Sequence, residues 1–332
     1  MPISNPDPKD RSLRFPLTSR RRQVWLISAV VLLISVAGLV LSWTNPQIRS
    51  PLRPGLDFTG GTKIQLERRC AAEACSDLSV STIENTLTAI PLPVEPGRRA
   101  PNLDTARVQL LDRGQSVVLR MPALTASQGQ AVIQALEPVA GPFVAGGQSV
   151  DTIGPSLGVQ LLRSSLLSLL VAFTGIAISI TIRYDRRFAF LALVALAHDI
   201  VIVCGVFAWL GLITGLEVDS LFAVALLTIA GYSVNDTVVV FDRIRERQRE
   251  DGDLHLTVQV DRAVSATLTR TLYTSGTTLL PLIALILFGG STLYWFAVAL
   301  ALGVVVGSWS SIALAPSLLS LWPSRTSAQA SA

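Results

Sequence analysis

The amino-acid sequence predicts a polytopic α-helical membrane protein with six transmembrane helices and a small α+β domain outside the cytoplasm. Half of the 332 residues are hydrophobic and only 15% are charged, whereas an ordinary soluble domain carries about 25% charged residues. The stretch from Thr271 to Ser324 contains no Asp, Glu, Lys, Arg or His, and the mean hydropathy is +0.52. These values exclude a disordered chain, a collagen and a purely cytosolic enzyme.

Six apolar segments are long enough to cross the hydrocarbon core, which is about 30 Å thick and needs about 20 helical residues. The predicted spans are residues 24–43, 164–182, 188–213, 220–241, 263–288 and 292–322. The first is longer than the core of a signal peptide, about 7 to 15 residues, and lacks a small-x-small cleavage site, so we expect it to remain as an anchor. Gly289-Gly290-Ser291 divides the last uncharged tract into a hairpin.

The basic residues predict the orientation of these spans. Lys and Arg gather in the N-terminal segment 1–23, the short link 183–187, the loop 242–262 and the tail 323–332. All of these segments fall on one side of the predicted membrane. Because Lys-rich and Arg-rich loops stay in the cytoplasm, both termini are predicted to be cytoplasmic. The net charge of +4 therefore reflects topology, and no nucleic-acid partner is expected.

Residues 44–158 lie outside the cytoplasm in this topology and suffice for one small domain. Alternating residues predict four strands: one that follows a Gly-rich entry within 55–67, and three at 105–111, 117–121 and 148–153. Helical spacing predicts two helices, at 78–90 and, after the capping residue Thr125, through Leu136. This order indicates a ferredoxin-like sheet with helices on one face. Gly60-Gly61 is not followed by Gly-Lys-Ser/Thr, so it predicts a tight strand entry, not a phosphate loop.

Two cysteines in this domain, Cys70 and Cys75, are close enough in sequence to form a disulfide in an oxidising compartment. Two free or buried thiols are an equally good interpretation of the spacing. The histidines of the chain, His198 and His255, lie in other segments. We therefore expect no metal site and no cofactor.

Ionisable residues inside the predicted spans are the strongest functional signal, because a charge at the bilayer centre costs about 2.5 to 3.5 kcal/mol on insertion scales. His198-Asp199 falls about 18 Å into the third span, close to the midplane. Asn235-Asp236 falls about 9 Å from the cytoplasmic end of the fourth span, and Arg270 about 12 Å from the same face. Asp236 and Arg270 are thus a candidate ion pair, and these five residues are a candidate proton relay.

A carboxylate that alternates between an Arg partner and a proton can load and release protons as helices move. The alternative is a static buried pair that holds the bundle together. For His198 the alternative is a hydrogen bond to a backbone carbonyl. The sequence leaves these interpretations open.

Several segments together resemble the SecF family of protein-export membrane proteins. They are Gly55–Thr62, Gly154–Gly158, His198-Asp199, Leu227–Glu246 and Arg270–Thr278. The long motif of the fourth span is the most specific of them. The resemblance implies six spans and one extracytoplasmic domain in a fold related to the resistance-nodulation-division transporters. It places Asp236 and Arg270 at positions tied to proton conduction, and Asp199 at a polar position of the third span.

The same resemblance implies a partner and a role. A subunit of this kind is expected to pair with SecD as a heterodimer, to work with the SecYEG channel and indirectly with SecA, and to use the proton-motive force on a translocating preprotein. It is expected to be a transport auxiliary and not an enzyme. Its expected place is the bacterial inner membrane, surrounded by membrane lipids, or the thylakoid membrane if the source is photosynthetic.

Three other functions fit parts of the sequence. A proton-driven exporter of small molecules or lipids would carry a larger substrate-binding domain than residues 44–158 provide. An intramembrane aspartyl protease needs two nearly contacting carboxylates, whereas Asp199 and Asp236 are predicted at different depths, and neither lies in a Gly-x-Gly-Asp motif. A pure scaffold predicts that neutralising Asp236 or Arg270 leaves activity unchanged.

Overall fold

The computed structural model describes residues 16–69, 78–94, 101–104, 106–111, 114–250 and 254–321. The chain divides into two compact units. The helical unit comprises Met1–Arg53 with Ser165–Ala332, and the sheet unit comprises Pro54–Ser164. Cys70 and Cys75 lie outside the described residues, so their pairing stays a prediction.

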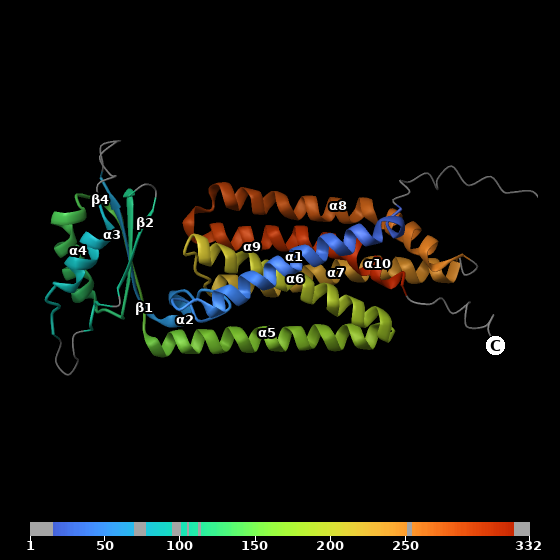
Figure 1. The fold of residues 1–332 in the computed structure, drawn as a ribbon, viewed down its shortest axis with the longest axis horizontal. Helices are drawn as coiled ribbons and strands as arrows, with labels where there is room; N and C mark the ends of the chain where they lie inside the picture. The colour runs from blue at the N-terminus through green and yellow to red at the C-terminus, as the bar shows by residue number, and fades with distance from the viewer. Residues whose placement is uncertain are drawn as a thin grey trace, which may run out of the picture. The chain divides into compact units, whose positions relative to one another are not determined.

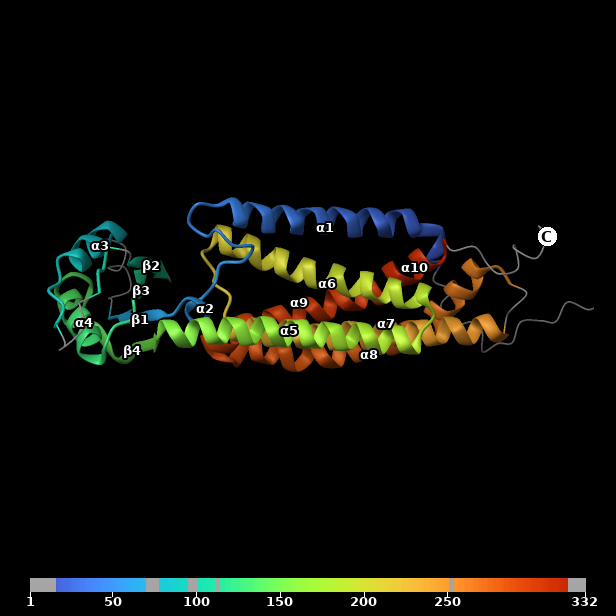
Figure 2. The ribbon, with the colours of Figure 1, turned by 90° about the horizontal axis from the view of Figure 1, so that it is seen from below.

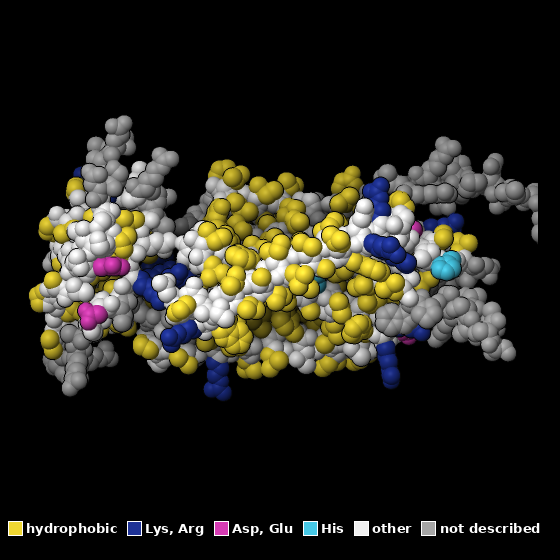
Figure 3. All heavy atoms as spheres, viewed as in Figure 1, with side chains coloured by type: hydrophobic (Ala, Val, Ile, Leu, Met, Phe, Trp, Pro, Cys, Tyr) yellow, Lys and Arg dark blue, Asp and Glu magenta, His cyan; other side chains and the backbone are white. Residues whose placement is uncertain are grey.

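Six helices are long and apolar enough to span a membrane. They are α1 (Arg21–Thr44), α5 (Pro155–Arg183), α6 (Arg186–Ile213), α7 (Ser220–Glu250), α8 (Leu256–Phe288) and α9 (Gly290–Trp309), the last continuing into α10 (Ala315–Leu319) (Figures 1 and 2). Their number confirms the prediction. Many Leu, Ile and Val side chains of α1 and α5 are exposed. Figure 3 shows many hydrophobic side chains spread over the face of the helical unit in view, as expected for a surface that faces lipid.

The helices are longer than the predicted spans at their polar ends. α7 continues through Arg243–Glu250, and α8 begins at Leu256, so most of the predicted loop 242–262 is helical. Hydropathy marks the apolar part of a helix, and here the polar ends carry stabilising i,i+3 pairs, Arg243 with Glu246 and Arg247 with Glu250. The predicted hairpin is present, because α8 ends at Phe288 and α9 begins at Gly290.

The last span is interrupted by a π-helical turn, Ser310–Leu314, between α9 and α10. A π-turn accommodates one extra residue in an otherwise α-helical path and is frequent at functional sites. All five of its residues are buried.

Close backbone contacts hold the helices of this unit together. α1 packs against α6, where a Cβ atom added to Gly205 would lie 2.3 Å from the Cβ atom of Ser35. Trp209 of α6 donates a hydrogen bond to the carbonyl of Ile34 at 2.9 Å. In the same way a Cβ atom on Gly303 of α9 would meet the side chain of Ile229 of α7 at 2.3 Å. A small residue of α9 therefore lets this helix pack closely on α7.

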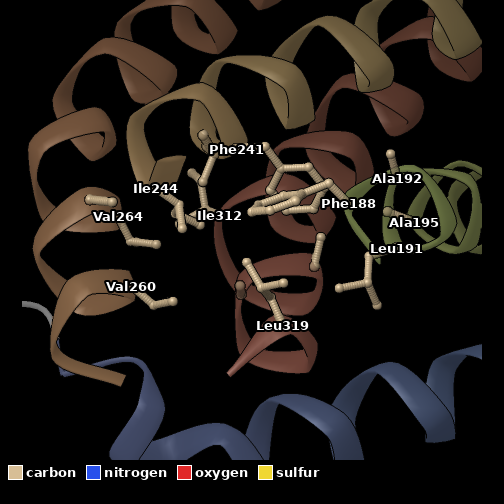
Figure 4. Close-up of a cluster of buried hydrophobic side chains, with 14 of the residues drawn as sticks. Phe188, Leu191, Ala192, Ala195, Phe241, Ile244, Val260, Val264, Ile312 and Leu319 are labelled. Atoms are coloured by element: carbon tan, nitrogen blue, oxygen red, sulfur yellow. The ribbon is translucent and has the colours of Figure 1, made fainter. Parts of the chain in front are cut away.

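A hydrophobic cluster fills the end of the helical unit that carries the α5–α6 link. Figure 4 shows Phe188 and Leu191 of α6, Phe241 and Ile244 of α7, Val260 and Val264 of α8, and Ile312 and Leu319 of the last span gathered around one centre. The rings of Phe188 and Phe241 meet edge to face, with centroids 5.1 Å apart. Four chain segments are thereby fixed against one another.

A polar cluster lies beside this hydrophobic cluster and is centred on the link between α5 and α6. It consists of Arg183, Tyr184, Asp242 and Arg245 and is here called the polar latch. Tyr184 is buried and its hydroxyl donates a hydrogen bond to Asp242 Oδ1 at 2.8 Å. Arg183 pairs with the other oxygen of Asp242 at 3.0 Å, and the Arg245 guanidinium lies 5.3 Å from the centre of the Tyr184 ring. Burial, followed by the hydrogen bond to Asp242, raises the pKa of Tyr184 from 10.0 to about 12.

Replacing Tyr184 with Phe is expected to lower stability by about 1 kcal/mol at neutral pH, because it removes the hydrogen bond to Oδ1 of Asp242. A raised pKa means that the folded protein holds the phenolic proton more tightly than the unfolded chain. The stabilisation is therefore complete below pH about 10 and is lost as the pH rises to about 12. Unfolding temperatures in detergent should thus differ between wild type and Tyr184→Phe at pH 8 and converge above pH 11.

The matched control is Tyr273→Phe, since Tyr273 is 72% exposed on α8. It should follow the wild-type curve at every pH. A Tyr184→Phe difference that persists unchanged to high pH would mean that the latch does not depend on the phenolic proton.

The sheet unit has the predicted ferredoxin-like order. Its elements are α2 (Leu56–Thr59), β1 (Gly61–Arg68), α3 (Val80–Thr88), β2 (Arg107–Leu111), β3 (Ser116–Met121), α4 (Ala126–Ala140) and β4 (Phe143–Ile153). The strands form one antiparallel sheet in the order β2-β3-β1-β4. Inward residues such as Ile64, Leu66 and Leu119 form its core with α3 and α4. Thr125 caps α4 in a capping box with Gln128.

In the predicted Gly-rich entry, residues 56–59 form the helical turn α2 before β1 begins at Gly61. The two glycines after α2 allow close backbone contacts. Gly60 has φ +67°, and a Cβ atom there would lie 2.9 Å from the Cα atom of Pro155. A Cβ atom on Gly61 would meet the carbonyl oxygen of Met121 at 2.7 Å. This confirms the tight strand entry.

Candidate functional site

Asp199 of α6 is the centre of a buried polar cluster and is 0% exposed. Its Oδ2 atom accepts hydrogen bonds from the hydroxyls of Ser233 at 2.6 Å and Ser310 at 2.7 Å. Its Oδ1 atom lies 2.9 Å from Nδ1 of His198. Three elements, α6, α7 and the π-turn, are joined at this one carboxyl group.

Small residues make this convergence geometrically feasible. A Cβ atom on Gly307 of α9 would lie 3.3 Å from the Cβ atom of Ser233 and 3.7 Å from Asp199 Oδ2. The following π-turn begins at Ser310, which directs its hydroxyl to the carboxyl group. A larger residue at position 307 would push the last span away from Asp199.

One ring nitrogen of His198 has no hydrogen-bond partner among the described residues. With Asp199 ionised, the carboxylate can only accept, so Nδ1 carries the proton in their hydrogen bond. The opposite ring nitrogen, Nε2, is buried and finds no hydrogen-bond partner among the described residues. The alternative of a bond to a backbone carbonyl is thus absent here, and His198 forms its hydrogen bond with Asp199 through Nδ1.

Asp236 lies one helical turn from Ser233 on α7 and is 4% exposed. Its Oδ2 atom is buried and has no hydrogen-bond partner among the described residues. Arg270 of α8 is near enough to attract the carboxylate electrostatically. Within the described residues, however, no ion pair joins the two side chains in this conformation. Asp236 is therefore a buried carboxyl group that has a cation nearby, and its Oδ2 atom accepts no hydrogen bond from the described residues.

The side chains of Asn235 and Arg270 are exposed on the outer surface of the helical unit. Tyr273 and Thr274 of α8 are exposed on the same helix. Polar groups at the depth of a bilayer are costly against lipid and normally face a protein partner or a water-filled cavity. These four exposed residues of α7 and α8 are here called the α7–α8 polar face.

A second hydroxyl network links α7, α8 and α9. Tyr232 donates to Ser275 at 3.0 Å, and Ser275 lies 2.6 Å from Ser308. Most of the threonines on α8 bond to carbonyls of their own helix, as Thr274 does with Thr271. Cross-helix hydrogen bonding by α8 therefore rests on Ser275 more than on these threonines.

The structure brings together part of the residue set predicted from the sequence. His198 and Asp199 are joined, and Asp236 lies near Arg270, but Asn235 faces away from the interior. Asp199 bonds to Ser233, which lies three residues and about 4.5 Å along α7 from Asp236, so the two carboxyl groups are closer in depth than the sequence predicts. The carboxyl group of Asp199 nevertheless bonds to two serines and a histidine, not to Asp236, which does not resemble a protease dyad.

Two family models match the chain. The model for the SecD/SecF protein export membrane protein C-terminal region matches residues 138–325. The model for the SecD/SecF GG motif matches residues 49–72, which include Gly60 and Gly61. Together they cover the buried polar cluster, the α7–α8 polar face and the tight strand entry.

Curated relatives match over nearly their full length. The protein translocase subunit SecF of Prochlorococcus marinus is 58% identical over 316 residues, 95% of this chain and 98% of the relative. The subunit of the same name from Synechocystis is 39% identical over 312 residues, covering 93% and 95% of the two chains.

Solved structures show the same fold. The chain is similar to SecDF, a translocon-associated membrane protein from Thermus, with a TM-score of 0.75 at 29% identity over 96% of this chain. A SecDF structure in a super-membrane-facing form gives a TM-score of 0.61 at 30% identity. The chain spans about 40% of the length of each of these structures.

Proposed function

The chain belongs to the SecD/SecF family of protein export membrane proteins, and from this premise we propose that it couples the proton-motive force to preprotein translocation through Asp236. The observation that carries the proposal is a buried carboxyl group with an open oxygen beside a cation that is not bonded to it. Such a group can take up a proton when Arg270 is distant and release it when Arg270 approaches.

The remaining residues of the predicted relay have supporting roles. Asp199 and His198 form a second protonatable unit, which connects α6 to α7 and to the last span through Ser233 and Ser310. A change of charge on Asp199 would alter hydrogen bonds to both neighbours at once. We propose that this unit transmits the protonation state to helix packing. Asn235 belongs to the α7–α8 polar face and not to the interior path.

The partner we propose is SecD, in a heterodimer. Some relatives are SecF subunits, and others are SecDF chains of which the part that matches this chain is about 40%. The rest of a SecDF chain therefore indicates the partner that a separate SecF subunit needs. The α7–α8 polar face supplies the contact surface, because Arg270 and Asn235 would otherwise meet lipid. The SecYEG channel, SecA acting indirectly and a translocating preprotein complete the proposed assembly.

The proposed location is the bacterial inner membrane with both termini in the cytoplasm, or a thylakoid membrane in a photosynthetic source. The distribution of Lys and Arg supports this orientation. We also propose that the chain performs no bond-making chemistry of its own. The names of its relatives favour translocation over a small-molecule exporter.

Replacing Arg270 with Met tests the coupling. Because Arg270 is exposed, the helical unit should fold normally. Asp236 would, however, lose the cation whose approach causes it to release its proton. In vesicles containing the complete translocase, the gradient-dependent part of preprotein export should disappear, and Arg270→Lys should restore part of it.

The matched control is Arg163→Met, an exposed arginine on α5, which should keep full gradient dependence. All variants are compared at equal protein level with and without an uncoupler. Full gradient dependence in Arg270→Met would show that the pair is structural and that coupling lies elsewhere in the assembly.

A further inference from the structure

A cavity of about 440 Å³ lies between α1, α6 and the end of the last span. Figure 2 shows α1 and α6 close together at one end and diverging towards the end where α10 lies. The cavity occupies this divergence. Its lining residues are Trp25, Ser28, Ala29 and Leu32 of α1, Val194, Ala197, His198 and Val201 of α6, and Leu314 and Leu318.

The cavity is closed at both ends along the helix axes. At one end the contact of Ser35 with Gly205 leaves no space between α1 and α6. At the other end Trp25 of α1 donates a hydrogen bond to Ser317 at 3.0 Å. The cavity is open at the protein surface, so its opening lies on the side of the helices. In a membrane, that side faces hydrocarbon.

The lining favours hydrocarbon over water. It is almost entirely apolar, and a buried water normally needs two to four polar partners. The volume corresponds to about 15 water-sized groups. A methylene group is of similar size, so the space suits most of one acyl chain.

The predicted cytoplasmic end of the cavity carries a positive cluster, Arg20, Arg21 and Arg22. The guanidinium of Arg21 lies 5.9 Å from the centre of the Trp25 ring, and Trp25 lines the cavity. Among the described residues no carboxylate forms an ion pair with these arginines. Basic groups next to a space between transmembrane helices on the cytoplasmic side suit an anionic headgroup.

We propose that this cavity is a binding site for an anionic phospholipid, with one acyl chain between α1 and α6 and the phosphate beside Arg21 and Arg22. The charge of the arginines selects the headgroup, and the apolar lining accepts the chain.

Occupancy has a consequence for the buried polar cluster. His198 lines the cavity, and its Nε2 atom has no partner among the described residues. An acyl chain over this edge of the ring keeps water away from His198 and hence from Asp199. This nitrogen lacks a hydrogen-bond partner among the described residues whether the cavity is empty or filled with hydrocarbon, so the acyl chain breaks no existing hydrogen bond. The lipid acts as a seal between the polar cluster and the surrounding membrane.

The test uses the full chain in nanodiscs with phosphatidylglycerol that carries a photoreactive acyl chain. After irradiation, peptide mapping should find adducts in residues 25–32 or 194–201, several-fold above the exposed faces of α1 and α5. Phosphatidylcholine with the same chain should label these peptides several-fold less. Labelling spread evenly over the lipid-facing helices would overturn the site, and equal labelling by both lipids would overturn the anionic headgroup.

Ala197→Phe fills the cavity from α6, where Ala197 is exposed, and should abolish the specific adducts. Ala29→Phe repeats the test from α1. Leu33→Phe is the control, because Leu33 is 68% exposed on α1 and does not line the cavity. Arg21→Gln with Arg22→Gln should remove the preference for phosphatidylglycerol, whereas Arg249→Gln should not. Adducts that survive both filling variants would overturn the proposal.

Discussion

Asp236→Asn is expected to remove the whole gradient-dependent part of preprotein export while the chain stays folded and assembled. Asparagine has the shape of aspartate but cannot bind or release a proton at physiological pH. If Asp236 carries the transported proton, export with a gradient should therefore fall to the rate measured without one. Export that depends on ATP alone should be unchanged.

Stability should move in the opposite direction from activity, which separates this result from simple misfolding. A buried carboxylate with an unpaired oxygen is costly, and Asp236 Oδ2 is such an atom. Removing the charge should leave the unfolding temperature unchanged or raise it. A variant that is at least as stable as wild type and yet uncoupled would identify Asp236 as a functional group and not as packing.

The measurement is export into vesicles at matched amounts of complex, with the proton gradient intact or collapsed. Asp236→Glu should keep partial coupling because it retains a carboxyl group. Asp185→Asn is the control, since Asp185 is an exposed carboxylate at the start of α6. Undiminished gradient dependence in Asp236→Asn would rule out Asp236 as the coupling residue.

Gly205→Leu should cause the largest loss of stability of any single substitution considered in the helical unit. The new Cβ atom would lie 2.3 Å from the Cβ atom and 2.4 Å from the Cα atom of Ser35. A clash with backbone cannot be relieved by a side-chain rotation, so α1 and α6 must separate. Overpacking of this kind costs about 1 to 3 kcal/mol and sometimes more, and we expect the upper part of that range.

The control is Gly175→Leu on α5, where an added Cβ atom meets nothing within 4 Å. Leucine favours a helix over glycine by roughly 1 kcal/mol, so this variant should be neutral or slightly more stable. Thermal unfolding in detergent should then separate the two leucine variants clearly. Similar unfolding temperatures would mean that α1 does not depend on its contact with α6.

The sequence was sufficient for the broad architecture because that architecture follows from hydropathy and charge. Six apolar segments must become helices, since only helices satisfy their backbone hydrogen bonds in lipid, and their number is confirmed. The sheet order also followed from alternation and turn residues. Helix ends were less predictable, because polar extensions such as Arg243–Glu250 carry no hydropathy signal.

The site was predicted only in part. Asp236, Arg270, Asp199 and His198 were found because ionisable residues are rare in spans. Ser310 was missed, since one serine in an apolar helix is an ordinary residue, and its role depends on a π-turn that no periodicity reveals. The cluster of Ser308, Ser310 and Ser311 after Gly303 and Gly307 was the available signal. The direct contact of Asp236 with Arg270 was inferred from depth, which fixes position along a helix but not the direction around it.

The π-turn in the last span also constrains how the length of this chain can vary. Because the π-turn already accommodates one extra residue, a deletion within Ser310–Leu314 would restore a regular α-helix and keep the direction of α10, whereas one more inserted residue would rotate everything after it by about 100°. After such an insertion Leu319 would leave the core shown in Figure 4, and Ser317 would leave Trp25. Related chains should therefore tolerate insertions between α7 and α8 but none between Gly307 and Leu319.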